Sequence, residues 1–412
     1  MPRAYRAGLR RVAVDVRPLR HGDFRRLFLG QGVSFIGFQL TAVAVPVQMY
    51  AVTHSSFWVG LMGLAGLVPL VILGLYGGSV SDAVDRRSLL LVASLVAWLV
   101  TGALFVQAAV GADNRWLLLA LVALQAGAFA MTSPTRNALV PRLLPADLVA
   151  AGNTLSFTMG NLGAVLGPLL AGLVLVRGGY AWAYAIDALL FTAGLYAAVR
   201  LPPIPPIGQT TRPGLRSVLA GLSFIGTRPV LLLSFVVDIV AMALALPRAL
   251  FPEVAQDRFG GAGGAAWLFA AISIGSVAAG LVSGWIGRVQ RQGLALVVAI
   301  VAWGAAVALA GLARSLWLVV LLLAVAGAAD LISGVYRQTM LQTYAPDEMR
   351  GRLQGVFIVV VAGGPRLGDL RAGAVAGWVG ATASWVGGGL ACIVVVIVVA
   401  LRFPTLVRYR AG

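Results

Sequence analysis

Apolar residues in this chain gather into twelve long runs separated by short polar stretches. A helix that crosses a bilayer needs about 20 mostly apolar residues. Every run meets this length, so the pattern predicts an all-α membrane protein with twelve transmembrane helices. The runs lie near residues 24–50, 57–80, 88–110, 115–139, 149–176, 180–200, 229–252, 264–287, 292–313, 315–340, 353–377 and 380–402.

A longer polar stretch, residues 201–228, separates the sixth run from the seventh and begins with the sequence LPPIPP. Proline lacks a backbone donor and favours extended geometry, which suits a spacer between two bundles. The sequence therefore predicts an N-terminal six-helix bundle over residues 1–200, which includes a basic tail. A linker over residues 201–228 and a C-terminal six-helix bundle over residues 229–412 follow.

The two predicted bundles also repeat each other in sequence. With a shift of 201 positions, residues 136–140 (RNALV) align with residues 337–341 (RQTML), and with a shift of 202 positions, residues 78–81 (GSVS) align with 280–283 (GLVS). Parallel repeats of long apolar segments are typical of secondary transporters. The repeat therefore indicates transport rather than catalysis.

Composition supports a membrane protein and narrows its chemistry. Hydrophobic residues make up 60% of the chain and charged residues 11%, and the mean hydropathy is +0.93. So few charges cannot cover a soluble globule of this length. No loop or span shows a nucleophile, base and oxyanion donor at a catalytic spacing, so we do not expect an enzyme.

Cysteine and histidine are too sparse to suggest a metal site or a cofactor. Cys392 is the only cysteine, which excludes an internal disulfide. His21 and His54 fall in a tail and a loop on opposite predicted sides of the membrane. The chain has no lysine and hence no Walker-type nucleotide loop, so we expect no cofactor and no metal.

All 31 basic residues are arginines, and their distribution predicts the orientation of the chain. Twenty-four lie in the tails and in the loops on the same side as the linker, and two lie inside the eleventh run. Because loops rich in arginine stay in the cytoplasm, both termini and the linker are predicted to be cytoplasmic. The five on the other side are Arg115, Arg177, Arg248, Arg258 and Arg314.

The net charge of +17 is concentrated where anionic lipids would meet it, rather than on a surface for nucleic acid. We therefore expect contact with membrane lipids and no nucleic-acid partner. The first apolar run opens a full span, so no cleavable secretion signal is expected. The tail arginines are Arg3, Arg6, Arg10, Arg11, Arg17, Arg20, Arg25 and Arg26.

The loop after the second run, residues 78–87 (GSVSDAVDRR), resembles the G-x-x-x-D-(R/K)-x-G-(R/K)-(R/K) signature of the major facilitator superfamily. It departs at Ala83, where the family has a base, and at Asp85, where the family has glycine. The resemblance implies a latch that holds one closed geometry through charges and a helix terminus. The alternative is a charge cluster that only fixes topology. The latch residues would be Asp82, Arg86 and Arg87.

The fifth run carries residues 163–172 (GAVLGPLLAG), which is similar to the G-x-x-x-G-P-x-x-G-G element of exporters in that superfamily. The residues that match are Gly163, Gly167, Pro168 and Gly172. Glycines four apart let helices approach closely, and the proline bends the span. Generic packing of small residues is the alternative, because the chain has 51 glycines.

Shorter patches resemble the siderophore-exporting branch of the superfamily, which enterobactin exporters typify. These patches are residues 44–49 (AVPVQM), 53–56 (THSS), 59–61 (VGL), 341–343 (LQT) and 349–352 (MRGR). The resemblance extends from about residue 24 to about residue 402. It implies export of a siderophore or a related amphipathic metabolite, with macrolide and multidrug efflux proteins as near relatives.

Charged residues inside spans are costly and usually face a cavity or a partner. Asp238 and Asp330 fall near mid-depth, so either could carry a proton in exchange for substrate, or be a fixed charge. Asp187 is expected to make a structural contact. Arg366 and Asp369 share one helix face, and we expect a local ion pair there.

Four residues are candidates to line a substrate cavity: Gln39, Asn161, Arg366 and Asp369. Amides inside spans can bind a polar ligand or join helices, and sequence does not separate these uses. The repeat partners Arg136 and Arg337 end their spans on the cytoplasmic side. We expect them to hold a gate or to bind lipid phosphate, with substrate contact the less favoured use.

The sequence thus predicts a secondary exporter in the cell membrane that works by proton antiport and alternating access. Its expected partners are a small-molecule substrate, protons and membrane lipids, and a monomer is expected. Broad drug efflux and a non-transporting membrane scaffold or sensor are the alternatives.

Overall fold

The structure is a computed structural model that describes residues 15–83, 85–204, 215–344, 346 and 350–410. Several predicted features lie outside the described residues. These are the tail arginines Arg3, Arg6, Arg10 and Arg11, and the linker residues Pro205, Pro206, Arg212 and Pro213.

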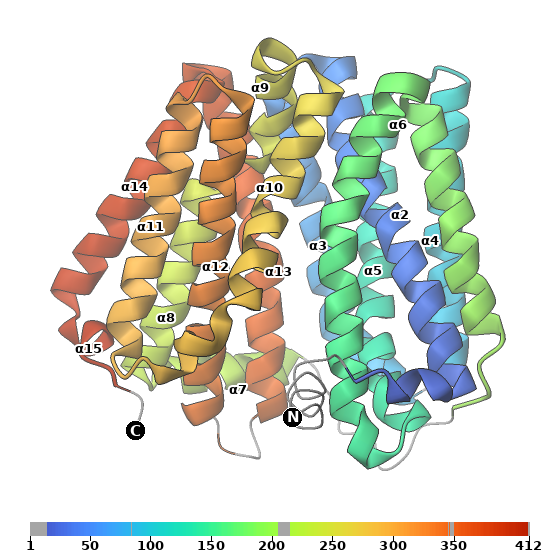
Figure 1. Ribbon diagram of the computed structural model, residues 1–412, viewed down its shortest axis with the longest axis horizontal. Helices are drawn as coiled ribbons and strands as arrows, with labels where there is room; N and C mark the ends of the chain where they lie inside the picture. Colours follow the sequence, from blue (N-terminus) through green and yellow to red (C-terminus); the bar gives the residue numbers. More distant parts are fainter. Residues whose placement is uncertain (1–14, 84, 205–214, 345, 347–349, 411–412) are drawn as a thin grey trace, which may run out of the picture.

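Helices form two groups that stand side by side (Figure 1). The first group follows the first half of the chain: η1 (Arg17–Arg20), α2 (Gly22–Thr53), α3 (Ser56–Ala83), α4 (Arg86–Ala109), α5 (Arg115–Leu143), η2 (Ala146–Leu148) and α6 (Val149–Val199). The second group follows the second half: α7 (Leu215–Gly226), α8 (Pro229–Val240), η3 (Ala241–Ala245), η4 (Arg248–Leu250), α9 (Phe251–Arg258), α10 (Ala262–Leu281), η5 (Ser283–Arg288), α11 (Gln292–Leu312), α12 (Leu316–Tyr344), α13 (Arg350–Val379), α14 (Ala381–Arg402) and α15 (Pro404–Val407).

The first and last described helices, η1 and α15, lie at the same end of the molecule, the lower end in Figure 1. We call this the terminal end. The opposite end, where α9 lies, is the distal end. Since α2 starts beside η1 and the helices alternate in direction, α3 and α5 begin at the distal end.

Ten segments of the described chain are helices long and apolar enough to cross a membrane. One of them contains α6, which is two helices joined at Gly179, where φ is 74°. Glycine adopts this left-handed geometry without the clash of a Cβ atom. The 30-residue α13 also has spanning length, but it carries Arg366, Asp369 and Arg371. These segments account for the twelve predicted spans and confirm the all-α fold.

Apolar side chains cover the outside of both groups, as a lipid-facing surface requires. Leu281, Trp378 and Leu401 are 84%, 92% and 77% exposed. Polar side chains point inward instead. In the first half, the amides of Gln48 and Gln107 donate to each other at 3.2 and 3.0 Å, and the hydroxyl of Tyr184 donates to Gln48 at 2.7 Å. This buried network ties α2, α4 and α6 together.

The predicted seventh span is interrupted near its middle. After α8 the chain forms the π-helical turn η3, passes through extended Leu246 and Pro247, and resumes as η4 and α9. Proline has no backbone donor, and the irregular turn releases further carbonyl groups. Such groups need partners, because hydrocarbon offers none.

Arg371 on α13 supplies these partners. Its guanidinium donates to the carbonyl oxygens of Ala243 at 3.2 Å and Ser384 at 3.0 Å, and also to that of Leu244. The hydroxyl of Ser384 in turn donates to Ala372 at 2.8 Å. A charge predicted only to lie inside the eleventh span thus stabilises the break in the seventh.

The two halves touch near the distal end. Gly60, Gly63 and Gly66 form one stripe on α3 that packs against the backbone and Arg366 side chain of α13. A Cβ added at Gly60 or Gly63 would meet α13 backbone atoms, so only glycine permits this approach. The hydroxyl of Ser56 also donates to Glu253 on α9. Contacts between α6 and α10 also join the two halves.

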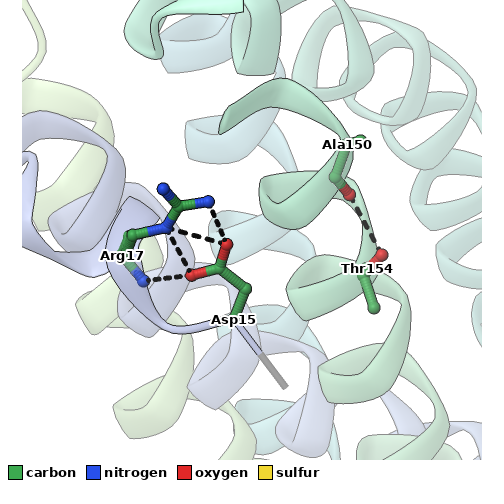
Figure 2. Close-up of polar contacts among 4 residues, drawn as sticks. All are labelled: Asp15, Arg17, Ala150 and Thr154. Atoms are coloured by element: carbon green, nitrogen blue, oxygen red, sulfur yellow. Dashed lines mark hydrogen bonds and ion pairs between the residues drawn. The ribbon is translucent and has the colours of Figure 1, made fainter. Parts of the chain in front are cut away.

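The described N-terminal segment lies beside the start of α6 (Figure 2). Arg17 donates to both carboxylate oxygens of Asp15, at 2.7 Å at the closest, and this hydrogen bond lowers the pKa of Asp15. Arg26 pairs with Asp23 at 3.1 Å. In the first turns of α6, Thr154 donates to the carbonyl of Ala150 at 3.0 Å. Two tail arginines therefore already have acidic partners within the chain.

Both described parts of the linker are fixed to the bundles. Ile204 donates its backbone N–H to Asp85 at 3.0 Å and accepts that of Arg86 at 3.2 Å. After residue 214, α7 packs against α13, with Ile225 in an apolar cluster that includes Phe235 and Leu353. The extended geometry expected across residues 201–228 is therefore wrong for α7, because its apolar side finds a helix to pack on.

We predict that Arg371→Met lowers the free energy of unfolding by about 1–3 kcal/mol, because it leaves buried carbonyl groups without donors. Arg371→Lys should fall between wild type and Arg371→Met. Thermal unfolding of the purified protein in detergent measures the difference. Arg402→Met, at an exposed arginine near the end of α14, is the control. Equal stability of the Arg371→Met and Arg402→Met variants would contradict the role given to Arg371.

Candidate functional site

The two predicted proton carriers meet at one arginine in the second half. Arg337 on α12 forms an ion pair with Asp238 on α8, and its other terminal nitrogen lies 3.8 Å from Asp330. Arg337 also donates to the backbone carbonyl of Ser333 at 3.4 Å. The structure thus brings together Asp238, Asp330 and Arg337, which we call the acid–arginine cluster.

Helix geometry explains half of this cluster. Asp330, Ser333 and Arg337 follow one another at spacings of three and four on α12, so they share one face. Asp238 comes from another helix, and nothing in the local sequence indicates that it faces Arg337. An arginine expected to hold a gate or bind lipid phosphate therefore has two carboxylate neighbours inside the bundle.

The two carboxylates of this cluster differ in their access to water. The side chain of Asp238 is 4% exposed, whereas that of Asp330 is 34% exposed. All three members line one cavity, together with Ser276, Phe357 and Pro365 among others. Asp330 is therefore open to this cavity, whereas Asp238 is covered by its neighbours.

A second cavity lies between the two halves and is lined from both. We call it the central cavity. Three of the four predicted substrate residues line it: Gln39 from α2, and Arg366 and Asp369 from α13. Its apolar walls include Phe38, Phe129 and Phe269. Asn161 does not line the central cavity.

The predicted local ion pair between Arg366 and Asp369 is not found among the described residues. Asp369 lies beside Ala249 and Arg248, at the break in the seventh span. The guanidinium of Arg366 lies over Gly66 of α3 instead. The interrupted span changes the partner of Asp369, which spacing along α13 alone could not show.

Arg248 is a cavity residue that the sequence assigned to an outer loop. It lies in η4 inside the interrupted span, lines the central cavity, and has its guanidinium carbon 5.8 Å from the ring centre of Phe269. Pro247 just before it was the available signal, because proline inside an apolar run marks a break. The central cavity thus contains two arginines and one carboxylate.

As far as the structure describes them, the predicted latch residues make their contacts with other residues of the first half. Arg87 donates to the carbonyl of Val199 at the end of α6, at 2.8 Å. Asp85 caps α4 by accepting the backbone N–H of Ser88 at 3.1 Å. Arg86 begins α4, and Asp82 lies in the last turn of α3 with its side chain outside the described part.

The glycines of the export-helix motif face two different helices. A Cβ at Gly163 would meet Phe35, and one at Gly167 would meet Gln39, so both allow α6 to approach α2. Gly172 instead faces Ala266 of α10, in the other half of the molecule. Pro168 is buried between them. The motif therefore positions Gln39 and also contributes to distal contact between the halves.

The remaining polar candidates lie in the first half. Arg136 and Asn161 both line a cavity between α2, α5 and α6. Asp187, which is fully buried, accepts the hydroxyl of Thr41 at 2.5 Å. The expected structural contact of Asp187 is thus with α2.

Comparison with known proteins shows relatives over almost the whole chain. The family described as transmembrane secretion effectors matches residues 13–408. The enterobactin exporter EntS of Shigella boydii serotype 18 is 30% identical over 396 residues, which cover 95% of this chain and 94% of the relative. The enterobactin exporter EntS of Escherichia coli O81 matches to the same extent.

Solved transporter structures share the fold at low identity. The nucleoside transporter NupG matches with a TM-score of 0.72 and 15% identity, over 94% of this chain and 100% of that one. A bacterial homolog of the human lysosomal transporter Spinster, solved in an inward-facing and unoccupied conformation, matches with a TM-score of 0.70 and 16% identity. That match covers 96% of this chain and 98% of the other.

We predict strong energetic coupling between Asp238 and Arg337. Arg337→Met should lower the free energy of unfolding by about 3–5 kcal/mol, because it leaves two carboxylates in the bundle without their cation. For the double variant Asp238→Asn/Arg337→Met, the decrease should be smaller than the sum of the two single decreases by at least about 1 kcal/mol. Unfolding of all four proteins in one detergent gives the cycle.

The exposed pair Arg26 and Asp23 provides the matched control, since both side chains are about half exposed. Its coupling should stay below about 1 kcal/mol. Additive losses at Asp238 and Arg337 would mean that the two residues do not act as a pair.

Proposed function

Because the chain belongs to the transmembrane secretion effector family and is a multi-pass major facilitator transporter, not an enzyme, we propose that it exports a siderophore or related amphipathic metabolite by proton antiport. It would act in the cell membrane with both termini, and hence the terminal end, in the cytoplasm. The domain division proposed is two six-helix bundles, residues 1–200 and 229–412, that rock about the central cavity.

One observation carries the substrate class: the charge and chemistry of the central cavity. Arg248 and Arg366 oppose a single carboxylate, Asp369, so the cavity has a net positive charge. Phe38, Phe129 and Phe269 add aromatic faces to the wall. A planar guanidinium favours oxygen anions, and aromatic rings favour flat organic groups. An anionic, ring-bearing metabolite fits this lining, whereas a cationic drug would meet repulsion.

The enterobactin exporters support the same class by similarity over almost the whole chain. These relatives export enterobactin, and we propose a cargo of that kind here. Gln39 and the arginines would bind its oxygen atoms. Distal contact between the halves leaves the terminal end as the side from which cargo would enter.

The acid–arginine cluster supports proton coupling by simple charge balance. Arg337 carries one positive charge, and Asp238 and Asp330 together carry two negative charges when ionised. Uptake of one proton makes the cluster neutral, and an uncompensated charge inside a bundle is costly. We therefore propose that one proton binds this cluster per cycle, through the more exposed Asp330, and weakens the hold of Arg337.

Deletion of the gene in its host should cut secretion of the siderophore under iron limitation and raise its level in the cytosol. Chromatography of supernatant and cell extract measures both pools. A restored wild-type copy should recover secretion, whereas Arg366→Met should not, because it removes one central cation. Arg402→Met at the exposed end of α14 is the matched control. Unchanged secretion together with greater drug susceptibility would point to broad drug efflux instead.

Proton coupling is tested in proteoliposomes that hold the purified protein and enterobactin. An imposed pH gradient should drive uphill movement by wild type. In Asp330→Asn, uphill movement driven by the pH gradient should fall by at least about tenfold. Exchange of cargo across the membrane should be retained, because exchange needs no net proton movement. Thr343→Val, at an exposed position near the end of the same helix, is the control. Full gradient dependence in Asp330→Asn would remove Asp330 from the coupling step.

A further inference from the structure

Arg136 on α5 is a cation inside the bundle, and it pairs with no acidic side chain that the structure describes. Within the described residues, neither an ion pair nor a hydrogen bond of its guanidinium is found. The guanidinium stays protonated in proteins. Charges at such positions usually face a partner or a ligand. Arg136 therefore needs a negative group that the described chain does not supply.

The internal repeat shows what is missing. Arg337, the repeat partner of Arg136, has Asp330 seven residues before it on α12. Seven residues before Arg136 on α5, the chain has Phe129. The second half thus contributes a carboxylate where the first half contributes an aromatic ring. The repeated arginine thus has a carboxylate neighbour in the second half, and its positive charge is left without that neighbour in the first half.

The surroundings of Arg136 suit an organic anion. It lines two adjoining cavities whose described lining residues include no Asp or Glu. Neutral hydrogen-bonding groups surround it, among them Gln31, Thr132 and Asn153, and the rings of Phe35 and Phe129 flank the space. An oxygen anion there would accept charge-assisted hydrogen bonds, while an attached ring would pack on aromatic faces.

These cavities adjoin the central cavity. The two that Arg136 lines share Gln31, Phe35 and Phe129, and the first of them shares Phe38, Gln125 and Phe129 with the central cavity. Since α5 runs from the distal to the terminal end, Arg136 lies about 10 Å beyond Phe129 toward the terminal end. Shared lining residues therefore place the cavities of Arg136 next to the cavity that contains Arg248 and Arg366.

We propose that Arg136 forms a binding site for one anionic oxygen group of the carboxylate, catecholate or phosphate class, separate from the central arginines. The group comes from the cargo or from a lipid head group. The role of this site as the first binding position of the cargo, before the central cavity, rests on the proposed function. Its ability to bind an anion does not depend on that function.

The first test uses radiolabelled salicylate and its neutral analogue salicylamide, with the full protein in nanodiscs of zwitterionic lipid. Wild type should bind salicylate at Arg136, and Arg136→Met should lose that site or bind about tenfold more weakly. Salicylamide binding should be unchanged, which shows that the variant is folded. Arg136→Lys should retain part of the affinity. The matched control is Arg142→Met, at an exposed arginine farther along α5.

Equal loss in Arg136→Met and Arg142→Met, or no loss in either, overturns the site. Two further arms identify the source of the anion. Phosphatidylglycerol in the nanodiscs should displace salicylate from wild type but not from Arg136→Met if a lipid phosphate occupies the site. Enterobactin should instead show about a tenfold higher KM in Arg136→Met, with kcat little changed, if the cargo does.

The same experiments separate the two proposals. Salicylate binding through Arg136 without enterobactin transport by wild type would refute the proposed function and keep the anion site. Normal enterobactin transport with no effect of Arg136→Met on KM or on salicylate would refute the site and keep the function.

Discussion

Hydrocarbon offers neither a hydrogen-bond partner nor a counter-charge, and this constraint governs every irregular feature of the fold. The seventh span can break only because α13 brings donors and an acceptor to the break. Arg371 donates to the carbonyls of Ala243 and Leu244, and the carboxylate of Asp369 lies beside Ala249. The break in turn places Arg248 in the central cavity. The break in the seventh span and the α13 side chains beside it therefore form part of the candidate binding site.

The same constraint gives the two halves different tasks on one repeated framework. In the second half, Arg337 lies beside Asp238 and Asp330, so the net charge of the cluster depends on whether the two carboxylates are ionised. In the first half, Arg136 faces uncharged cavity walls. The glycine stripe on α3 and Gly172 on α6 bring the halves together near the distal end. In the proposed antiport, coupling between proton and cargo would depend on two charge balances, one at Arg337 and one at Arg136. One rocking motion would connect them.

Most of the fold could be predicted from the sequence, because span length and apolar runs are local properties. Even the turn at Gly179 coincides with the gap between the fifth and sixth predicted spans. The site was predicted less completely. Asp238, Asp330 and Arg337 were recognised as charged residues within spans, but not as one cluster. Arg248 was missed because a break in a span changes its depth, and hydropathy does not register a broken hydrogen-bond ladder.

The sequence by itself determined the membrane environment, the twelve spans, the repeat and the family. These follow from composition, periodicity and motifs, which need no knowledge of neighbours in space. Only the tertiary structure decided which charges meet: Asp238 with Arg337, Arg371 with Ala243, and Arg136 with no acid among the described residues. Pairing of charges depends on contacts between helices far apart in the chain, and such contacts are fixed by packing rather than by local spacing.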